Sequence, residues 1–86
     1  MPEICNFFGI SINIYYDDHN PPHFHAEYGE FRILVEIDDF SVLKGFLSPR
    51  ALGLVMEWAL IHKSELMEEW KLAKDNKALF KIKPLI

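Results

Sequence analysis

Apolar and polar side chains alternate along the first half of the chain. From Ile10 to Tyr16 every second residue is isoleucine or tyrosine, and a similar alternation returns over residues 23–28 and 31–37. This two-residue period predicts β-strands that bury one face and leave the other polar. Gly9 indicates a turn or bulge after a short leading strand, and residues 40–43 favour one further short strand.

A glycine separates two of these alternating runs. A two-residue loop with glycine first, here Gly29-Glu30, is typical of a type II′ β-hairpin. In the register that this loop sets, His25 lies opposite Leu34 and His23 lies opposite Glu36. The polar face of the predicted hairpin carries five side chains: His23, His25, Glu27, Arg32 and Glu36.

The second half of the chain changes to a helical period at Ser48-Pro49. Serine caps helices, proline suits the first helical position, and apolar residues then recur at spacings of three and four as far as Ala73. We predict one helix from Pro49 to about Asp75, which at 1.5 Å per residue is roughly 40 Å long. Such a helix either bends near Lys63-Ser64 or extends onto another subunit. Residues 79–83 predict a short final strand.

These elements predict one α+β domain over residues 1–86. Its expected architecture is a small, largely antiparallel β-sheet packed on one long C-terminal α-helix, with a short final strand. Half of the residues are hydrophobic and 14% are aromatic, which favours a folded core. The segment Ala51–Ile61 is apolar on more faces than one small sheet can cover, so we expect a homo-oligomer.

The net charge of the chain limits the classes of partner that it can bind. Nine basic and 13 acidic residues give a net charge of −4, which argues against general binding to nucleic acid or to anionic membranes. A basic stretch from Lys71 to Lys83 keeps an RNA contact open. The single cysteine, Cys5, excludes an intrachain disulfide, and Ala51–Ile61 is too short to span a bilayer. We expect a cytoplasmic protein without membrane association.

The unusual chemistry is concentrated in the run Asp17-Asp18-His19-Asn20-Pro21-Pro22-His23-Phe24-His25. Two histidines at i and i+2 on a strand point their imidazoles to the same face. The run predicts a zinc-type divalent metal site with His19, His23 and His25 as ligands and Asp18 as their nearest carboxylate. Acid–base or nuclease-like chemistry and a purely structural turn are the alternatives.

A fourth histidine, His62, lies on the apolar stripe of the predicted helix. It is either a core histidine with its own hydrogen-bond partner or a further member of the loop site. The candidate catalytic residues are Asp18, His19, His23, His25 and His62.

Several segments together resemble one bacterial family. They are Met1-Pro2-Glu3-Ile4, Phe7-Phe8-Gly9, Asp18-His19-Asn20-Pro21-Pro22-His23-Phe24-His25, Arg50-Ala51-Leu52, Glu57-Trp58-Ala59 and Lys81-Ile82-Lys83-Pro84-Leu85. By these motifs the chain resembles the family catalogued as domain of unknown function 4160. The resemblance implies a small stand-alone protein that is commonly encoded beside a member of domain of unknown function 2442. That arrangement is similar to a toxin–antitoxin pair.

Two classes of function follow. The first is a protein-binding partner in a two-component, toxin–antitoxin-like system, bound to the small protein of the neighbouring gene. The second is a metal- or histidine-dependent hydrolase or nuclease that uses the loop with His19, His23 and His25.

Overall fold

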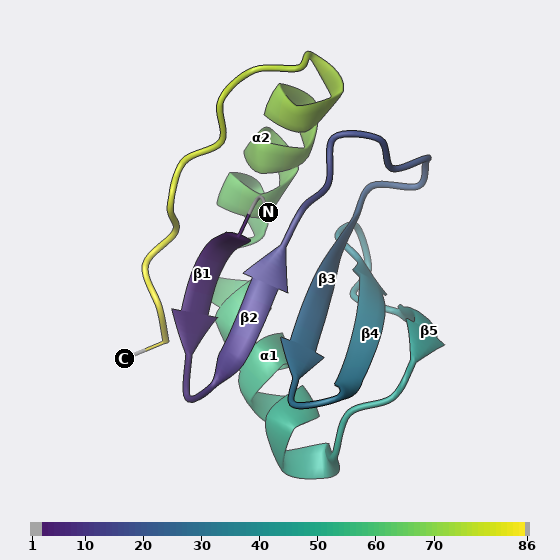
Figure 1. Cartoon of the computed structure of the whole chain (residues 1–86), viewed down its shortest axis with the longest axis vertical. Helices are drawn as coiled ribbons and strands as arrows, with labels where there is room; N and C mark the ends of the chain where they lie inside the picture. Colours follow the sequence, from purple (N-terminus) through teal and green to yellow (C-terminus); the bar gives the residue numbers. More distant parts are fainter. Residues whose placement is uncertain (1–2, 86) are drawn as a thin grey trace.

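The computed structural model of the chain describes residues 3–85. Five strands form one antiparallel sheet in the order β1-β2-β3-β4-β5, and two helices lie behind it (Figure 1). The strands are β1 (Glu3–Phe7), β2 (Ile10–Asn13), β3 (His23–Tyr28), β4 (Phe31–Glu36) and β5 (Val42–Gly45), and the helices are α1 (Pro49–Ile61) and α2 (Lys63–Lys74). The predicted α+β class and the antiparallel sheet are confirmed.

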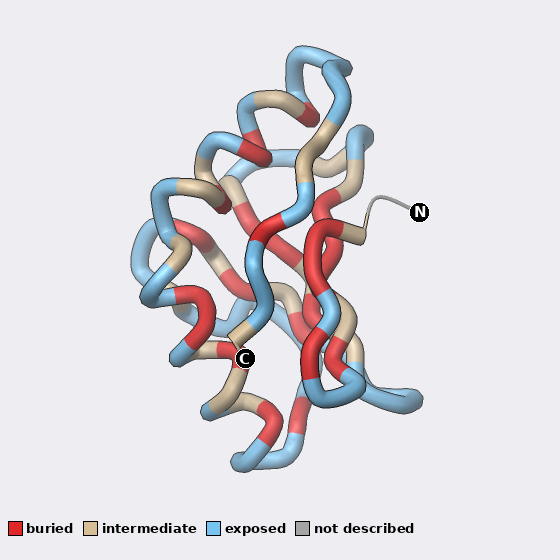
Figure 2. The backbone as a smooth tube through the Cα atoms, turned by 90° about the vertical axis from the view of Figure 1, so that its left-hand side faces the viewer, coloured by how far each residue is buried: buried red, intermediate tan, exposed pale blue. Residues whose placement is uncertain are grey.

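The alternating pattern separates the two faces of the sheet as predicted. Ile12 on β2, Phe24 on β3 and Val35 on β4 are fully buried on the face toward the helices. Trp58 of α1 is also fully buried and packs against the ring of Phe24, with the ring centres 6.1 Å apart. Figure 2 shows this core from the side, with buried positions between the helix layer and the sheet layer.

The β3–β4 hairpin has the predicted register. His25 pairs with Leu34 and His23 pairs with Glu36, as the Gly29-Glu30 loop requires. Gly29 has a φ of 62°, whereas Glu30 is not among the described residues with positive φ. A positive φ at the first loop position alone is the property of a type II′ turn that favours glycine there.

The predicted single long helix is wrong, because the chain forms two helices. The helical geometry breaks at His62, where φ is −112° and ψ is 24°, and α2 starts at the next residue. The break lies one residue before the predicted bend at Lys63-Ser64. The longest dimension of the molecule is 33 Å, so bending keeps within the domain a helical segment that would measure roughly 40 Å if straight.

The predicted final strand is also wrong, since residues 79–83 are assigned to no strand. They run as an extended segment beside β1, where the Ile82 N–H donates to the Ile4 carbonyl at 2.8 Å. Ile82 is buried and Lys81 is exposed, so these side chains alternate as in a strand although a strand ladder does not form. The strand predicted at residues 40–43 is shifted along the chain, because β5 begins only at Val42 and ends at Gly45.

Within the described residues, no helix has the length and apolar character to cross a membrane.

One carboxyl group is enclosed between α2 and this C-terminal segment. Glu69 has no exposed surface, and its Oε1 accepts the Phe80 N–H at 3.0 Å while Oε2 has no hydrogen-bond partner. Burial raises the pKa of Glu69 from its ordinary value of 4.5 to about 7, against the lowering effect of the Phe80 N–H.

The replacement Glu69→Gln tests this buried acid. The unfolded chain ionises Glu69 near pH 4.5 and the folded chain near pH 7, so the wild type loses unfolding free energy as the pH rises between these values. The loss is on the order of 3 kcal/mol. Glutamine keeps an acceptor for the Phe80 N–H and cannot ionise. In urea unfolding we therefore expect the variant to gain stability relative to the wild type between about pH 5 and about pH 8.

Glu57→Gln provides the control, because Glu57 is exposed on α1 and its charge is not among those that shift the pKa of Glu69. Its stability relative to the wild type should change little over the same range. An equal pH dependence for both variants would contradict a special role of Glu69.

Candidate functional site

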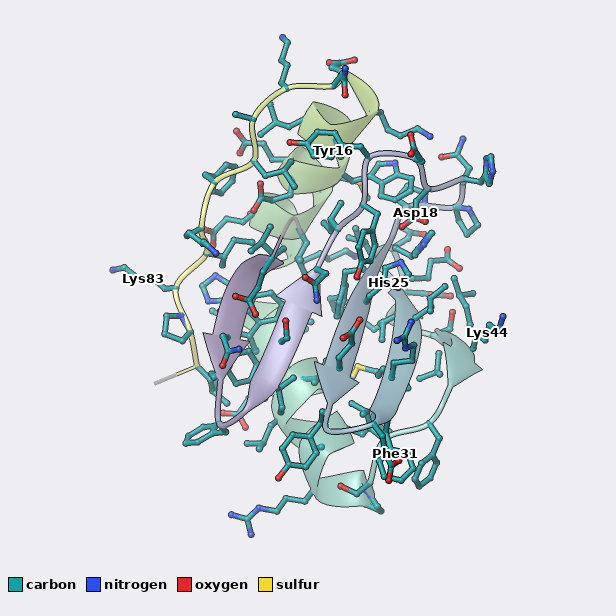
Figure 3. All side chains as sticks on the ribbon, viewed as in Figure 1. Tyr16, Asp18, His25, Phe31, Lys44 and Lys83 are labelled. Atoms are coloured by element: carbon teal, nitrogen blue, oxygen red, sulfur yellow. The ribbon has the colours of Figure 1, made fainter. Side chains whose placement is uncertain are left out.

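Asp18, His23 and His25 bring their polar atoms together where β3 begins. The Nε2 atom of His25 is 2.9 Å from Oδ2 of Asp18, and Nε2 of His23 is 3.2 Å from the same oxygen. The two histidines are the first and third residues of β3, so the strand turns both rings to one side. Figure 3 shows Asp18 reaching from the preceding loop to His25 at the start of this strand. We call these three residues the Asp–His cluster.

The His23 ring is the most enclosed part of the cluster. The residue is only 6% exposed, and its Nδ1 lies 2.8 Å from the Pro21 carbonyl oxygen. A carbonyl can only accept a hydrogen bond, so Nδ1 carries the proton. On the other side of the ring, Nε2 is buried and close to Asp18, but the two atoms are not aligned for a hydrogen bond. In the neutral ring this nitrogen carries a lone pair that no hydrogen-bond donor contacts.

The His25 ring is held by the neighbouring strand segment. The Tyr15 ring meets it edge-on, with the ring centres 4.6 Å apart, and the His25 side chain is 13% exposed. Burial raises the pKa of Tyr15, and the charge of Glu27 raises it further, so this phenol stays neutral. His25 therefore has its ring packed at right angles to Tyr15 and its Nε2 directed at Asp18.

Helix α2 supports the cluster from behind. The ring of Trp70 lies 5.2 Å from that of His23, centre to centre. The Lys74 ammonium donates to the Asp18 carbonyl at 2.7 Å and lies 5.3 Å from the Trp70 ring centre. These contacts anchor an otherwise exposed loop to a helix. Sequence reasoning did not identify them, because helical spacing alone gave Trp70 only a core or interface role.

Two of the predicted site residues lie outside the cluster. His19 is exposed and is not one of the grouped ligands, so Asp18 occupies the place that we predicted for it. His62 has its own partner: its Nδ1 lies 2.5 Å from Oε1 of Glu65, and its ring centre lies 5.4 Å from that of Trp58. Of the two interpretations of His62, the structure therefore supports the histidine with its own hydrogen-bond partner, which lies at the break between the helices.

The cluster has two chemical capacities. A carboxylate beside two imidazoles can orient one of them as a general base or acid. The same three groups can also donate one oxygen and two nitrogen atoms to a cation, and these atoms lie within 4.8 Å of one another. Among the described residues, Asp18, His23 and His25 form the set of histidine and carboxylate side chains whose ligand atoms are close enough to share one metal ion.

The chain is thus a small α+β protein with an antiparallel five-stranded sheet, two helices behind it and an Asp–His cluster at the start of the central strand. It belongs to the family described as Domain of unknown function (DUF4160), whose model matches residues 9–71 and therefore includes the whole cluster with Trp70. Comparison with curated proteins gives no match, and comparison with solved structures gives none.

Proposed function

We propose that the protein is a protein-binding module of the bacterial cytoplasm. In this proposal it pairs with the small protein of a neighbouring gene in a two-component, toxin–antitoxin-like system. One observation carries the proposal: exposed aromatic side chains gather at the end of the sheet opposite the Asp–His cluster. We call these residues the aromatic row; they are Phe8, Tyr28, Phe31 and Phe46.

The aromatic row follows from the turns of the sheet. Tyr28 and Phe31 flank the β3–β4 turn as cross-strand partners, and the Phe31 and Phe46 rings are 5.9 Å apart, centre to centre. The Tyr28 ring also packs over Gly9, next to Phe8 in the β1–β2 turn: a Cβ atom at Gly9 would lie 3.3 Å from it. The four rings are 44–61% exposed. Figure 1 shows both turns at the same end of the molecule.

Such a surface suits a protein partner. Aromatic residues are enriched at interfaces, and large contiguous apolar patches are unusual on monomers. A hollow of about 320 Å³ adjoins Phe8 and Tyr28, with Leu54 and Arg50 among its other lining residues. An apolar anchor side chain with a neighbouring acidic group would suit this lining. The partner proposed here is the small protein that the family resemblance implies.

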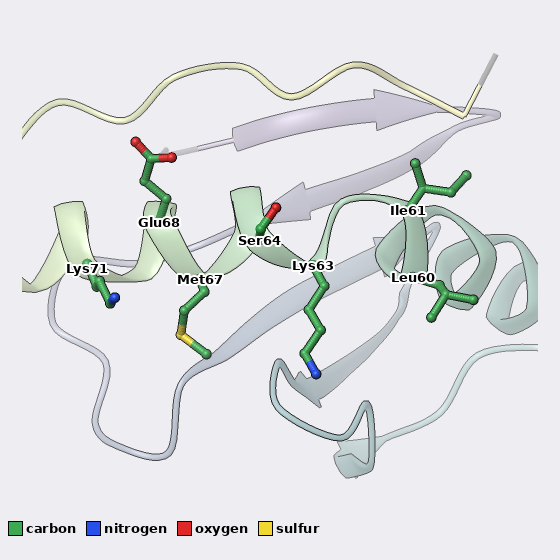
Figure 4. A pocket seen from close by; sticks show the side chains of 7 residues that line it. All are labelled: Leu60, Ile61, Lys63, Ser64, Met67, Glu68 and Lys71. Carbon is green, nitrogen blue, oxygen red and sulfur yellow. The ribbon is translucent and has the colours of Figure 1, made fainter.

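A second exposed apolar surface supports self-association. Leu60 and Ile61, at the end of α1, are 71% and 64% exposed. They border a hollow of about 770 Å³ along the outside of the helix junction, which also includes Lys63, Met67 and Lys71 (Figure 4). A symmetric dimer through this surface would cover the leucine and isoleucine.

The second candidate function is a histidine-dependent or metal-dependent hydrolase, including a nuclease. The observation that favours it is the Asp18 carboxylate within 3.2 Å of both imidazole Nε2 atoms. One imidazole would take a proton from water while the carboxylate stabilises the imidazolium that forms. The net charge of −4 disfavours a nucleic-acid substrate, so this function ranks second.

The double variant Phe31→Thr/Phe46→Ser tests the partner interface. Co-purified with the product of the neighbouring gene, it should bind about tenfold more weakly or worse, because central aromatic anchors dominate interface energies. The matched control is Leu60→Ser/Ile61→Ser, which removes two more exposed apolar residues from the helix layer and should keep the complex. The reverse pattern, or no complex with the wild type, would refute the proposal.

The same two variants test self-association by sedimentation equilibrium. We expect a wild-type dimer that becomes monomeric in Leu60→Ser/Ile61→Ser, since the symmetric contact loses its apolar centre. Phe31→Thr/Phe46→Ser should remain dimeric. A wild type that sediments as a monomer over the whole accessible concentration range would contradict this surface.

The hydrolase candidate predicts a different dependence. Loss of a positioned acid–base group lowers a rate by about 100-fold or more, so Asp18→Asn/His25→Gln should abolish phosphodiester or ester hydrolysis. It should also abolish any growth arrest that expression of the wild type alone causes. Arrest that persists in this variant and disappears in Phe31→Thr/Phe46→Ser would eliminate the hydrolase and leave the binding module.

A further inference from the structure

The spacing within the Asp–His cluster is close to that of a coordination sphere. Oδ2 of Asp18 lies 2.9 Å from Nε2 of His25 and 3.2 Å from Nε2 of His23. Around a tetrahedral zinc ion with bonds of about 2.0–2.1 Å, ligand atoms are about 3.3–3.4 Å apart. Both Asp18–histidine distances are near this value and all three atoms lie within 4.8 Å of one another, so side-chain rotations would bring them to bonding distance of one ion.

The hydrogen bond of His23 leaves one nitrogen free for a ligand. Because Nδ1 donates to the Pro21 carbonyl at 2.8 Å, the neutral ring has its lone pair at Nε2. That nitrogen is buried and has no hydrogen-bond partner, although the residue is 94% enclosed. Metal-binding histidines commonly donate their second ring N–H to a carbonyl in this way, which fixes the tautomer and the orientation.

Two acceptor atoms then lie close together in the cluster. In the neutral ring, Nε2 of His23 and Oδ2 of Asp18 are 3.2 Å apart without a shared hydrogen bond, an unfavourable contact in a site of low exposure. A cation between them converts this contact into two favourable ones. His25 can add a third bond, because its Nε2 faces the same carboxylate oxygen.

The surroundings hold the ligands in place. Trp70 packs against the His23 ring, Tyr15 packs against the His25 ring, and Lys74 fixes the Asp18 backbone from α2. A site preorganised in this way loses little conformational entropy when an ion binds.

The geometry points to a transition-metal site formed by Asp18, His23 and His25, with Zn²⁺ as the ion that fits best. Two imidazole nitrogens and one carboxylate oxygen suit zinc and its neighbours, whereas Mg²⁺ and Ca²⁺ prefer oxygen ligands alone. Three protein ligands leave a fourth position for water or a substrate group. The inference concerns ion binding, so it holds under either proposed function.

Zinc titration of the full chain, followed by calorimetry, tests the site. We expect one Zn²⁺ per chain with a dissociation constant below about 10 µM. Asp18→Asn and His25→Gln should each weaken binding at least about 100-fold, since even groups outside the coordination sphere are typically worth 10–100-fold. His25 and Asp18 are partly exposed, and a circular dichroism spectrum for each variant establishes that it is folded.

Two other histidines provide matched controls. His19→Gln, in the same loop, and His62→Gln, at the helix break, should keep the wild-type zinc affinity. In long-range ¹H–¹⁵N spectra, zinc should shift the Nε2 signals of His23 and His25 and leave those of His19 and His62 in place.

Three results would overturn the inference: no stoichiometric binding, binding that survives both Asp18→Asn and His25→Gln, or an equal loss in His19→Gln. A failure of the partner proposal can be told apart from a failure of the zinc site, because the complex with the neighbouring gene product is measured separately on the same variants. Asp18→Asn should keep that complex while losing zinc.

Discussion

The register of the β3–β4 hairpin is the constraint on which the rest of the molecule depends. Successive side chains of a strand point to opposite faces, so a slip of one residue would exchange the two faces completely. Phe24 and Ala26 would then leave the core, and His23 and His25 would enter it. The tight turn at Gly29, with its φ of 62°, opposes such a slip. Burial of the core on one face and placement of the two histidines on the other are thus two results of one pairing.

The bend at His62 has an equally direct consequence. The sequence around it contains neither proline nor an adjacent glycine, so periodicity alone predicted a continuous helix. The break is a tertiary effect: α1 buries Trp58 beneath the sheet, while α2 must bury Trp70 beside the loop before β3. A straight helix cannot meet both requirements in a molecule 33 Å long. Local sequence signals do not encode this choice.

The sequence was most informative where a period of two was strong. It predicted the hairpin register and the shared direction of His23 and His25. It failed where a long-range contact decides the conformation. Trp58 and Glu69 hold the C-terminal segment by side-chain bonds, which removes the need for a strand ladder. Asp18 rather than His19 joins the cluster because the loop is tied to Lys74, fifty-six positions away in the chain.

The two candidate surfaces occupy opposite ends of the same strand. His23 begins β3 and Tyr28 ends it, which separates them by about 17 Å at 3.3–3.4 Å per residue. At that distance, and without shared contacts, changes at the two ends should act independently. Coupling between ion binding and partner binding therefore requires the hairpin to move as one unit against the helices. Trp70 of α2 contacts one end of the hairpin at His23, and Tyr28 at the other end packs over Gly9 of the β1–β2 turn, so such a movement would change both surfaces together.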